Sequence, residues 1–230
     1  SDAETIRALQ FIPGYDQSGL KILDIGCGTG AQSLTVARNT QAEITAVDLF
    51  DAFLQKLNKR AEEEGYSDRI QRVKASMDDL PFKDAAFDII WSEGAIYNMG
   101  FEAGLKYWRR FLKPGGHISL SEITWTTELR PAKVQQFWER AYPDVDTASA
   151  KINILEREGF KPLGYFVLPE YCWMENYYAP MIQRFDTFLD KHGKTEEVLS
   201  LIEQERKEIQ LYEKYKDYFS YGFYIAKKLG

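Results

Sequence analysis

Three alternating glycines follow a short apolar segment near the start of the chain, in the run Lys-Ile-Leu-Asp-Ile-Gly-Cys-Gly-Thr-Gly at residues 21–30. Gly26, Gly28 and Gly30 would let the backbone turn sharply and let a ligand approach the main chain without a Cβ in the way. Residues 31–38 read as a helix, whose free N–H groups and positive dipole end favour a carboxylate or a phosphate. The pattern predicts a strand, a ligand-binding turn and a helix.

A carboxylate at the end of the next apolar segment could recognise a sugar. Asp48 ends the run Ile-Thr-Ala-Val-Asp and lies 18 residues after Gly30. Such a carboxylate can accept hydrogen bonds from both hydroxyls of an adenosine ribose, and it would repel a 2′-phosphate. Asp48 could instead cap the helix expected over 50–64. The glycines also fit a dinucleotide site, as Gly26-x-Gly28-x-x-Ala31, so these residues alone leave NAD open and disfavour NADP.

Strands and helices alternate along residues 20–124. Short β-branched or aliphatic runs predict the strands, and segments with helical spacing lie between most of them. This alternation predicts an α/β fold, a doubly wound, mostly parallel sheet with helices on both faces. Right-handed crossovers would then bring the carboxyl ends of the strands to one edge, where ligands bind. The expected strands are 20–25, 43–48, 69–74, 87–92 and 116–124, and the expected helices are 30–39, 50–64 and 101–112.

Asp24, two residues before the first glycine, extends the glycine pattern to Asp24-x-Gly26-x-Gly28-x-Gly30. This pattern resembles motif I of the class I S-adenosylmethionine (SAM) methyltransferases, in which the loop curls round the methionine part of SAM.

Further segments resemble the same family in the same order. They are Lys74–Phe82 after the third strand, Phe87–Ser92 as the fourth strand, and Phe111–Gly116 before the fifth. The whole match spans 20–124 and is more specific than any one piece. The sequence is similar to the methyltransferase-domain family that includes the ubiquinone/menaquinone C-methyltransferases, and Trp91–Asn98 is closest to bacterial members without an assigned substrate.

The resemblance implies a seven-stranded Rossmann-like sheet, SAM as methyl donor and a set of donor-binding residues. An acidic residue of the family usually meets the adenine amino group after the third strand. Ser76 stands at that position here, which is a departure, and Asp78 close by could take the role. The donor-binding residues that the resemblance implies are Asp24, Gly26, Cys27, Gly28, Gly30, Asp48, Leu49, Ser76, Met77, Asp78 and Ser92.

Methyl transfer from a sulfonium is an in-line displacement that needs no metal, and the protein mainly holds the acceptor atom behind the methyl carbon. A base is needed only if the acceptor must lose a proton. Glu93 and Tyr97 after the fourth strand are the candidate catalytic residues, with Glu122 after the fifth, and Glu93 could instead contact the methionine ammonium. His117 and His192 are weaker candidates, because His117 is expected at the sheet edge away from the ligand and His192 in an insertion.

Beyond residue 124 some fifty residues separate the last two expected strands. This helical insertion, 170–216, opens with the aromatic-rich stretch Tyr171–Tyr178, which would either pack the insertion onto the domain or form a lid over an apolar or aromatic acceptor. The acceptor pocket is expected between that stretch, the segment after Glu93, and a cover helix within residues 1–12. The other expected elements are helices 131–142, 147–159, 175–192 and 195–216, and strands 160–168 and 219–228.

Composition indicates one domain over residues 1–230. The net charge is −6 and basic residues are scattered, which argues against nucleic acid as a partner. Two distant cysteines fit a reducing cytoplasm, and Cys27 is expected to matter by being small. No apolar run is long enough to span a membrane and no signal peptide is visible, although the chain starts at Ser1 without a methionine. An apolar stripe in 196–216 predicts core packing or a homodimer contact.

The sequence therefore predicts a cytoplasmic SAM-dependent methyltransferase that acts on a small molecule. Two alternatives remain open. An NAD-linked oxidoreductase would use the same crevice, but no Tyr-x-x-x-Lys pair with a supporting serine is found, since Lys106 and Tyr107 are adjacent. A non-catalytic SAM-binding protein would need no base at all.

Overall fold

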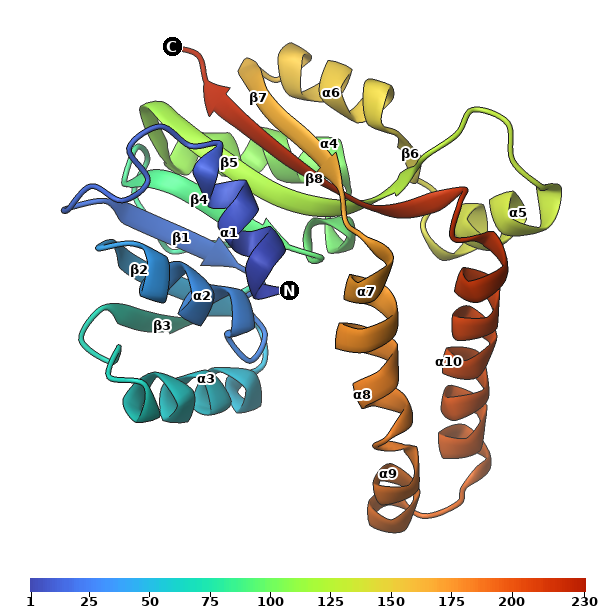
Figure 1. Cartoon of the computed structure of the whole chain (residues 1–230). Coiled ribbons are helices and arrows are strands. Elements are labelled where there is room, and N and C mark those ends of the chain that lie inside the picture. The colour runs from blue at the N-terminus through green and yellow to red at the C-terminus, as the bar shows by residue number, and fades with distance from the viewer.

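The computed structural model describes residues 1–230 and places all strands in one sheet (Figure 1). The strand order is β3-β2-β1-β4-β5-β8-β7, and the short β6 pairs with the end of β5. The first five strands run parallel, whereas β8 runs antiparallel to both of its neighbours. The strands are β1 (Lys21–Ile25), β2 (Glu43–Asp48), β3 (Ile70–Lys74), β4 (Phe87–Glu93), β5 (Leu112–Trp125), β6 (Asp146–Thr147), β7 (Phe160–Val167) and β8 (Phe219–Lys228).

Helices cover both faces of this sheet. The helices α1 to α3 pack on one face, and α4 and α6 pack on the other. The helices are α1 (Asp2–Gln10), α2 (Ala31–Asn39), α3 (Asp51–Glu63), α4 (Phe101–Trp108), α5 (Ala132–Ala141), α6 (Ala148–Arg157), α7 (Glu170–Trp173), α8 (Ala179–Ile182), α9 (Phe185–His192) and α10 (Glu196–Tyr215).

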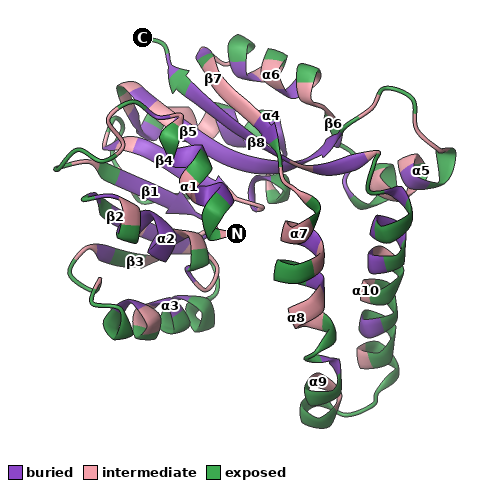
Figure 2. Cartoon of the chain, viewed as in Figure 1, coloured by how far each residue is buried: buried purple, intermediate pink, exposed green.

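Alternating side chains of the central strands build two apolar cores. In β1, Ile22 packs toward α1–α3, while Leu23 and Ile25 pack toward the opposite face. Because both faces are covered, apolar side chains of the strand point to both sides of the sheet, as is usual for parallel strands. Figure 2 shows the resulting buried sheet between partly exposed helices.

The predicted fold class is confirmed. The sheet is doubly wound and mostly parallel, and the helical insertion lies between β7 and β8 as expected. The eighth strand, β6, is an addition of two residues, too short for a periodic pattern to reveal it.

Two expected boundaries around residue 112 were wrong. The helix expected over 101–112 ends at Trp108 and continues as a 3-10 turn through Phe111, and β5 begins at Leu112 rather than 116. Leu112 pairs with Phe87 of β4, and the N–H of Ala86 donates to the carbonyl of Phe111 at 3.0 Å. These cross-strand contacts draw the Pro-Gly-Gly segment into the sheet, so pairing outweighs its local preference for a turn.

The first helix of the insertion also differs from the expectation. It begins at Glu170 instead of 175, and a π-helical turn at Met174–Tyr178 separates α7 from α8. Pro180 follows that turn and lacks the N–H that a regular helix would use, which accounts for the irregular hydrogen bonding.

The insertion forms a helical hairpin, with α7 to α9 on one side and α10 on the other, that projects from the sheet (Figure 1). Its base is fixed by aromatic packing. The Trp173 ring stacks on Tyr212 with centroids 4.6 Å apart, and the Trp173 Nε1–H donates to Ser220 Oγ at 3.0 Å. Leu199 and Leu201 of α10 stay half exposed, so the homodimer contact remains a prediction. None of the helices is at once long and apolar enough to cross a lipid bilayer.

Candidate functional site

The glycine loop joins β1 to α2 at the carboxyl edge of the sheet. The N–H groups of Gly26 and Cys27 both donate to the Val47 carbonyl at 2.9 Å, which fastens the loop to the end of β2. Gly28 has a φ of +55°, and no atom lies within 4 Å of the Cβ position that a side chain would add. The loop therefore presents open space to a ligand at Gly28.

The other two loop glycines serve packing. A Cβ on Gly26 would overlap the side chain of Ala95, and one on Gly30 would overlap Leu57 of α3. Gly30 begins α2, whose first turn has neither a side-chain cap nor an acidic residue. Unpaired N–H groups at a helix start favour an anionic ligand group such as a carboxylate.

Asp48 holds the glycine loop and the turn that leads into α3, although α3 itself has no side-chain cap. Its Oδ2 accepts the N–H of Gly28 at 2.9 Å, and its Oδ1 accepts the N–H of Phe50 at 2.9 Å. A carboxylate has about four acceptor positions, so roughly half remain for ligand hydroxyls. The expected alternative, that Asp48 caps this helix, was wrong, because its carboxylate accepts the N–H of Phe50, the residue before α3, and this half-buried side chain keeps acceptor positions for a ribose.

The residues expected near an adenine lie beside this loop. Leu49 is 54% exposed next to Asp48, and the Met77 side chain lies beside Gly26. The Met77 carbonyl accepts the Trp108 Nε1–H at 2.9 Å, which anchors the segment. Ser76 is partly exposed and Asp78 is exposed.

Asp24 and Glu93 are two carboxylates whose hydrogen-bond donors are all neutral groups. Ser33 and Gln32 donate to Asp24, while Trp91 and Thr5 donate to Glu93 Oε1 at 2.9 and 2.8 Å. Burial raises the pKa of Asp24 to about 7. The hydrogen bond from Ser33 lowers this pKa, whereas repulsion from the nearby carboxylates of Glu93 and Asp48 raises it further. Burial likewise raises the pKa of Glu93 above its usual range.

Ser92 and Cys27 are buried inside the edge of the sheet. The Ser92 hydroxyl donates to the Ile25 carbonyl at 2.9 Å, so it joins β4 to β1. The Cys27 thiol is 1% exposed, and burial raises its pKa, which makes a nucleophilic thiolate unfavourable. These two residues shape the loop, and their polar groups are turned to the protein.

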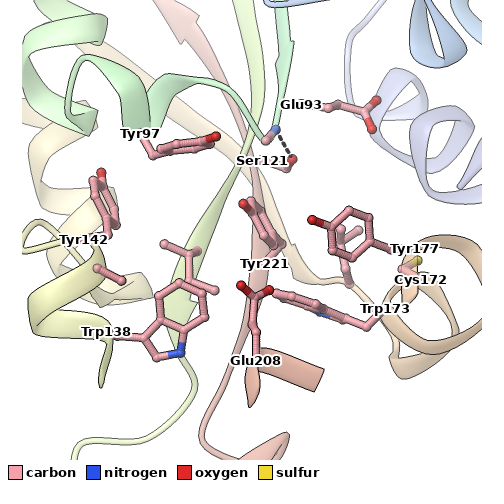
Figure 3. Close-up of a pocket in the computed structure, with 14 residues that line it drawn as sticks. Glu93, Tyr97, Ser121, Trp138, Tyr142, Cys172, Trp173, Tyr177, Glu208 and Tyr221 are labelled. Atoms are coloured by element: carbon pink, nitrogen blue, oxygen red, sulfur yellow. Dashed lines mark hydrogen bonds between the residues drawn. The ribbon is translucent and has the colours of Figure 1, made fainter. Parts of the chain in front are cut away.

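A cavity of about 480 Å³ has Glu93 and Gly94 in its wall, and Ala95, the next residue, lies against Gly26 of the loop (Figure 3). Its walls come from the ends of β4, β5 and β8, from α5, and from both sides of the helical hairpin. The lining residues are Glu93, Gly94, Tyr97, Ser121, Ile123, Trp138, Ala141, Tyr142, Leu168, Cys172, Trp173, Tyr177, Glu208 and Tyr221.

Both candidate catalytic residues line this cavity, and the weaker candidates do not. Tyr97 is 44% exposed in the 3-10 turn Ile96–Asn98 and packs edge-on against Tyr142. Glu122 is fully buried and faces Lys151 with 3.7 Å between Oε1 and Nζ. His117 lies in β5 opposite Lys227, and His192 ends α9.

The cover helix α1 supports the site from outside the cavity. Its Thr5 donates to Glu93, and its Glu4 accepts the Tyr171 hydroxyl at 2.7 Å, which ties α1 to the insertion. No residue of α1 lines this cavity, whereas Trp138 of α5 and Tyr142 directly after α5 do, so the expected role of α1 as a wall of the acceptor pocket stays a prediction. The positions of the two helices explain which of them lines the cavity, because α5 lies beside the end of β5, whereas α1 packs against α2.

The aromatic stretch 171–178 packs the insertion onto the domain and also lines the cavity, while its role as a lid stays a prediction. Trp173 and Tyr178 are buried in the base of the hairpin, while Tyr177 and Trp173 also face the cavity. Glu208 and Tyr221 are lining residues that sequence reasoning missed, because each lies in an ordinary helical or strand pattern with no motif around it.

Replacing Asp24 by asparagine should raise the free energy of unfolding of the ligand-free protein at pH 8 by about 1–3 kcal/mol. Folding raises the pKa of Asp24 from 3.8 to about 7, so its contribution to stability is lost as pH rises through that range. Asparagine does not ionise, so the gain over wild type should shrink toward pH 5. Urea denaturation at both pH values measures it, and equal stability at pH 8 would contradict the assignment of a penalised buried charge.

Comparisons with known proteins agree with this geometry. Residues 22–116 match the family described as "Methyltransferase domain". A sterol 24-C-methyltransferase of Gibberella zeae is 31% identical over 105 residues, which make up 45% of this chain and 28% of that protein. The 27-O-demethylrifamycin SV methyltransferase of Amycolatopsis mediterranei is 28% identical over 108 residues, 46% of this chain and 40% of that protein. The matched region thus covers well under half of either relative.

Solved structures share the fold over nearly the whole chain. A SAM-dependent methyltransferase from Geobacter sulfurreducens in complex with S-adenosyl-L-homocysteine gives a TM-score of 0.82 at 21% identity, covering 98% of this chain and 89% of that one. The [4+2]-cyclase SpnF gives a TM-score of 0.81 at 24% identity, covering 100% of this chain and 82% of that one.

Proposed function

This chain belongs to the class I SAM-dependent methyltransferases, and we propose that it transfers a methyl group from SAM to a small-molecule acceptor. One observation carries the proposal. The cavity-lining residue Gly94 is followed by Ala95, whose side chain lies against Gly26 of the glycine loop, so a donor in the loop and an acceptor in the cavity would be neighbours.

The loop residues fit the charges and shape of SAM. In this proposal Asp48 accepts the ribose hydroxyls, Leu49 and Met77 contact the adenine faces, and Asp78 meets the adenine amino group. The donor also carries an ammonium and a sulfonium, and the neutral surroundings of Asp24 and Glu93 leave both carboxylates free to attract positive charge.

The bound donor supplies an already activated methyl group, whose bond to sulfur breaks as the bond to the acceptor forms and the electron pair stays on sulfur. The chain's own contribution is orientation, because holding the acceptor in line can replace a large entropic cost. Where the acceptor must lose a proton, Glu93 and Tyr97 are the proposed bases, since both line the cavity. The raised pKa of Glu93 favours proton uptake there.

Two other functions are compatible with the fold. One is an NAD-linked oxidoreductase, which would use the same edge of the sheet. The other is a SAM-binding protein that transfers no methyl group, and the likeness to SpnF supports it because that protein has a similar fold and is described as a [4+2]-cyclase. Tritium transfer from methyl-labelled SAM into a metabolite extract tests the proposal. Labelled product supports transfer, and tight SAM binding without labelled product would leave a non-transferring SAM-binding protein. Tight binding of NAD with none of SAM would favour the oxidoreductase.

We also propose that the base of the hairpin closes over the donor. S-adenosylhomocysteine (SAH) should slow hydrogen exchange in 171–178, by up to about 100-fold at 100 times its Kd, if opening this segment releases the ligand. The Tyr171–Glu4 and Thr5–Glu93 hydrogen bonds connect the segment, through α1, to Glu93 at the end of β4. Exchange in the hairpin tip, 185–195, should stay unchanged and serves as the control. Equal exchange of 171–178 with and without SAH would leave the segment a packing element.

A further inference from the structure

The cavity beside the glycine loop has a one-sided charge. Its only carboxyl groups are those of Glu93 and Glu208, no lysine, arginine or histidine lines it, and burial raises the pKa of both carboxyl groups, so that a nearby cation would favour their charged form. A carboxylate or phosphate on the acceptor would therefore meet like charge in a partly desolvated space, which is unfavourable. A positive group would meet opposite charge.

Glu208 is held at the cavity wall without a cationic partner. One of its oxygens accepts the hydroxyl of the fully buried Tyr178 at 3.1 Å. The two basic neighbours on α10 are committed elsewhere, since Lys207 pairs with Glu203 at 2.7 Å and Arg206 stacks over Phe185 at 5.0 Å. The second carboxylate oxygen of Glu208 therefore has no basic partner on its own helix.

Aromatic rings surround the same carboxylate. Figure 3 shows Glu208 close to Trp173 and below Tyr221, with Tyr177 on the same side of the cavity. Trp173 and Tyr221 themselves pack together, with ring centroids 5.3 Å apart. The faces of such rings attract cations, most strongly where water is partly excluded.

We propose that the methyl acceptor carries a cationic nitrogen, an amine or ammonium group, which binds against Glu208 among Trp173, Tyr177 and Tyr221. This inference rests on the proposed function, because it places the acceptor in the cavity next to the donor loop. The apolar remainder of the cavity, with Ile123, Trp138 and Tyr142, then takes an apolar or aromatic body. The methyl-accepting atom lies toward Glu93, on the side where Ala95 contacts the loop.

Simple probes test this charge preference. The protein is first saturated with SAH, so that a cationic probe cannot occupy the donor loop. Benzyltrimethylammonium, benzyl alcohol and phenylacetate are then titrated by calorimetry. We expect the ammonium probe to bind about 10- to 100-fold more tightly than phenylacetate, as expected for one interaction with a charged group. Equal or tighter binding of phenylacetate overturns the proposal.

Two variants locate the preference. Glu208→Gln should abolish the advantage of the ammonium probe over benzyl alcohol, whereas Glu213→Gln, an equal charge change on the exposed side of α10, should preserve it. Tyr177→Leu, at a 49% exposed position, should weaken binding of the ammonium probe about threefold or more. SAH affinity and thermal melting confirm that each variant is folded. A Glu208→Gln protein that keeps the full preference overturns the proposal.

The two levels of inference fail separately. A protein that transfers label from SAM but shows no preference among the probes overturns the charge assignment and leaves the proposed function intact. A protein that prefers the ammonium probe but transfers no label supports the cation site and contradicts the proposed function.

Discussion

Replacing Gly28 by valine is expected to weaken SAH binding by about 100-fold or more, roughly 2.7 kcal/mol, while the fold stays native. The Cβ and both methyl groups would fill the open space that Gly28 leaves to the ligand. Its φ of +55° is also strained for a β-branched residue, so part of the effect could come from the backbone.

Gly65→Val separates these two causes. Gly65 follows α3 with a φ of +76°, and it too has no atom within 4 Å of its absent Cβ. It therefore imposes similar strain away from the loop. Calorimetry with SAH and circular dichroism compare the two variants. If Gly28→Val binds SAH as well as Gly65→Val does, the glycine loop is not the donor site.

Asp48→Ala should weaken SAH binding by about one to three powers of ten, because hydrogen bonds to a charged group contribute roughly 1.5–3 kcal/mol each. The substitution also removes the acceptors for the Gly28 and Phe50 N–H groups, so the loop itself loosens. Asp51→Ala, which removes an exposed carboxylate at the start of α3, is the matched control.

A ligand analogue distinguishes ribose binding from loop support. SAH without its ribose 2′-hydroxyl should lose affinity for the wild type but little further affinity for Asp48→Ala. Asp48→Asn should bind SAH better than the alanine variant and clearly worse than wild type, because its NH₂ group must face one of the two N–H donors. If removal of the hydroxyl costs the wild type and Asp48→Ala equally, Asp48 does not bind the ribose.

The sequence by itself determined the succession of strands and helices over residues 20–124 and the position of the loop. Apolar runs that end at Ile25 and Asp48 are local patterns. A tight turn whose backbone has a positive φ strongly favours glycine, so the loop is also marked locally. Asp48 could be identified from the same local patterns, because it ends a predicted strand and the carboxyl ends of parallel strands lie at one edge of the sheet, where ligands bind. Its double hydrogen bonding, to Gly28 in the loop and to Phe50 before α3, was not predictable, because it depends on how closely the two turns approach.

The cavity and its charge were decided only by the tertiary structure. Tyr97, Trp138, Glu208 and Tyr221 come from four different elements, and each has an ordinary local pattern. The extension of β5 to Leu112 likewise depended on pairing with β4. Periodicity says which face of an element is apolar, but it does not say which buried side chains touch a neighbour and which border open space. That distinction depends on the fit between elements, so the donor loop could be predicted from local residues and the acceptor cavity could not.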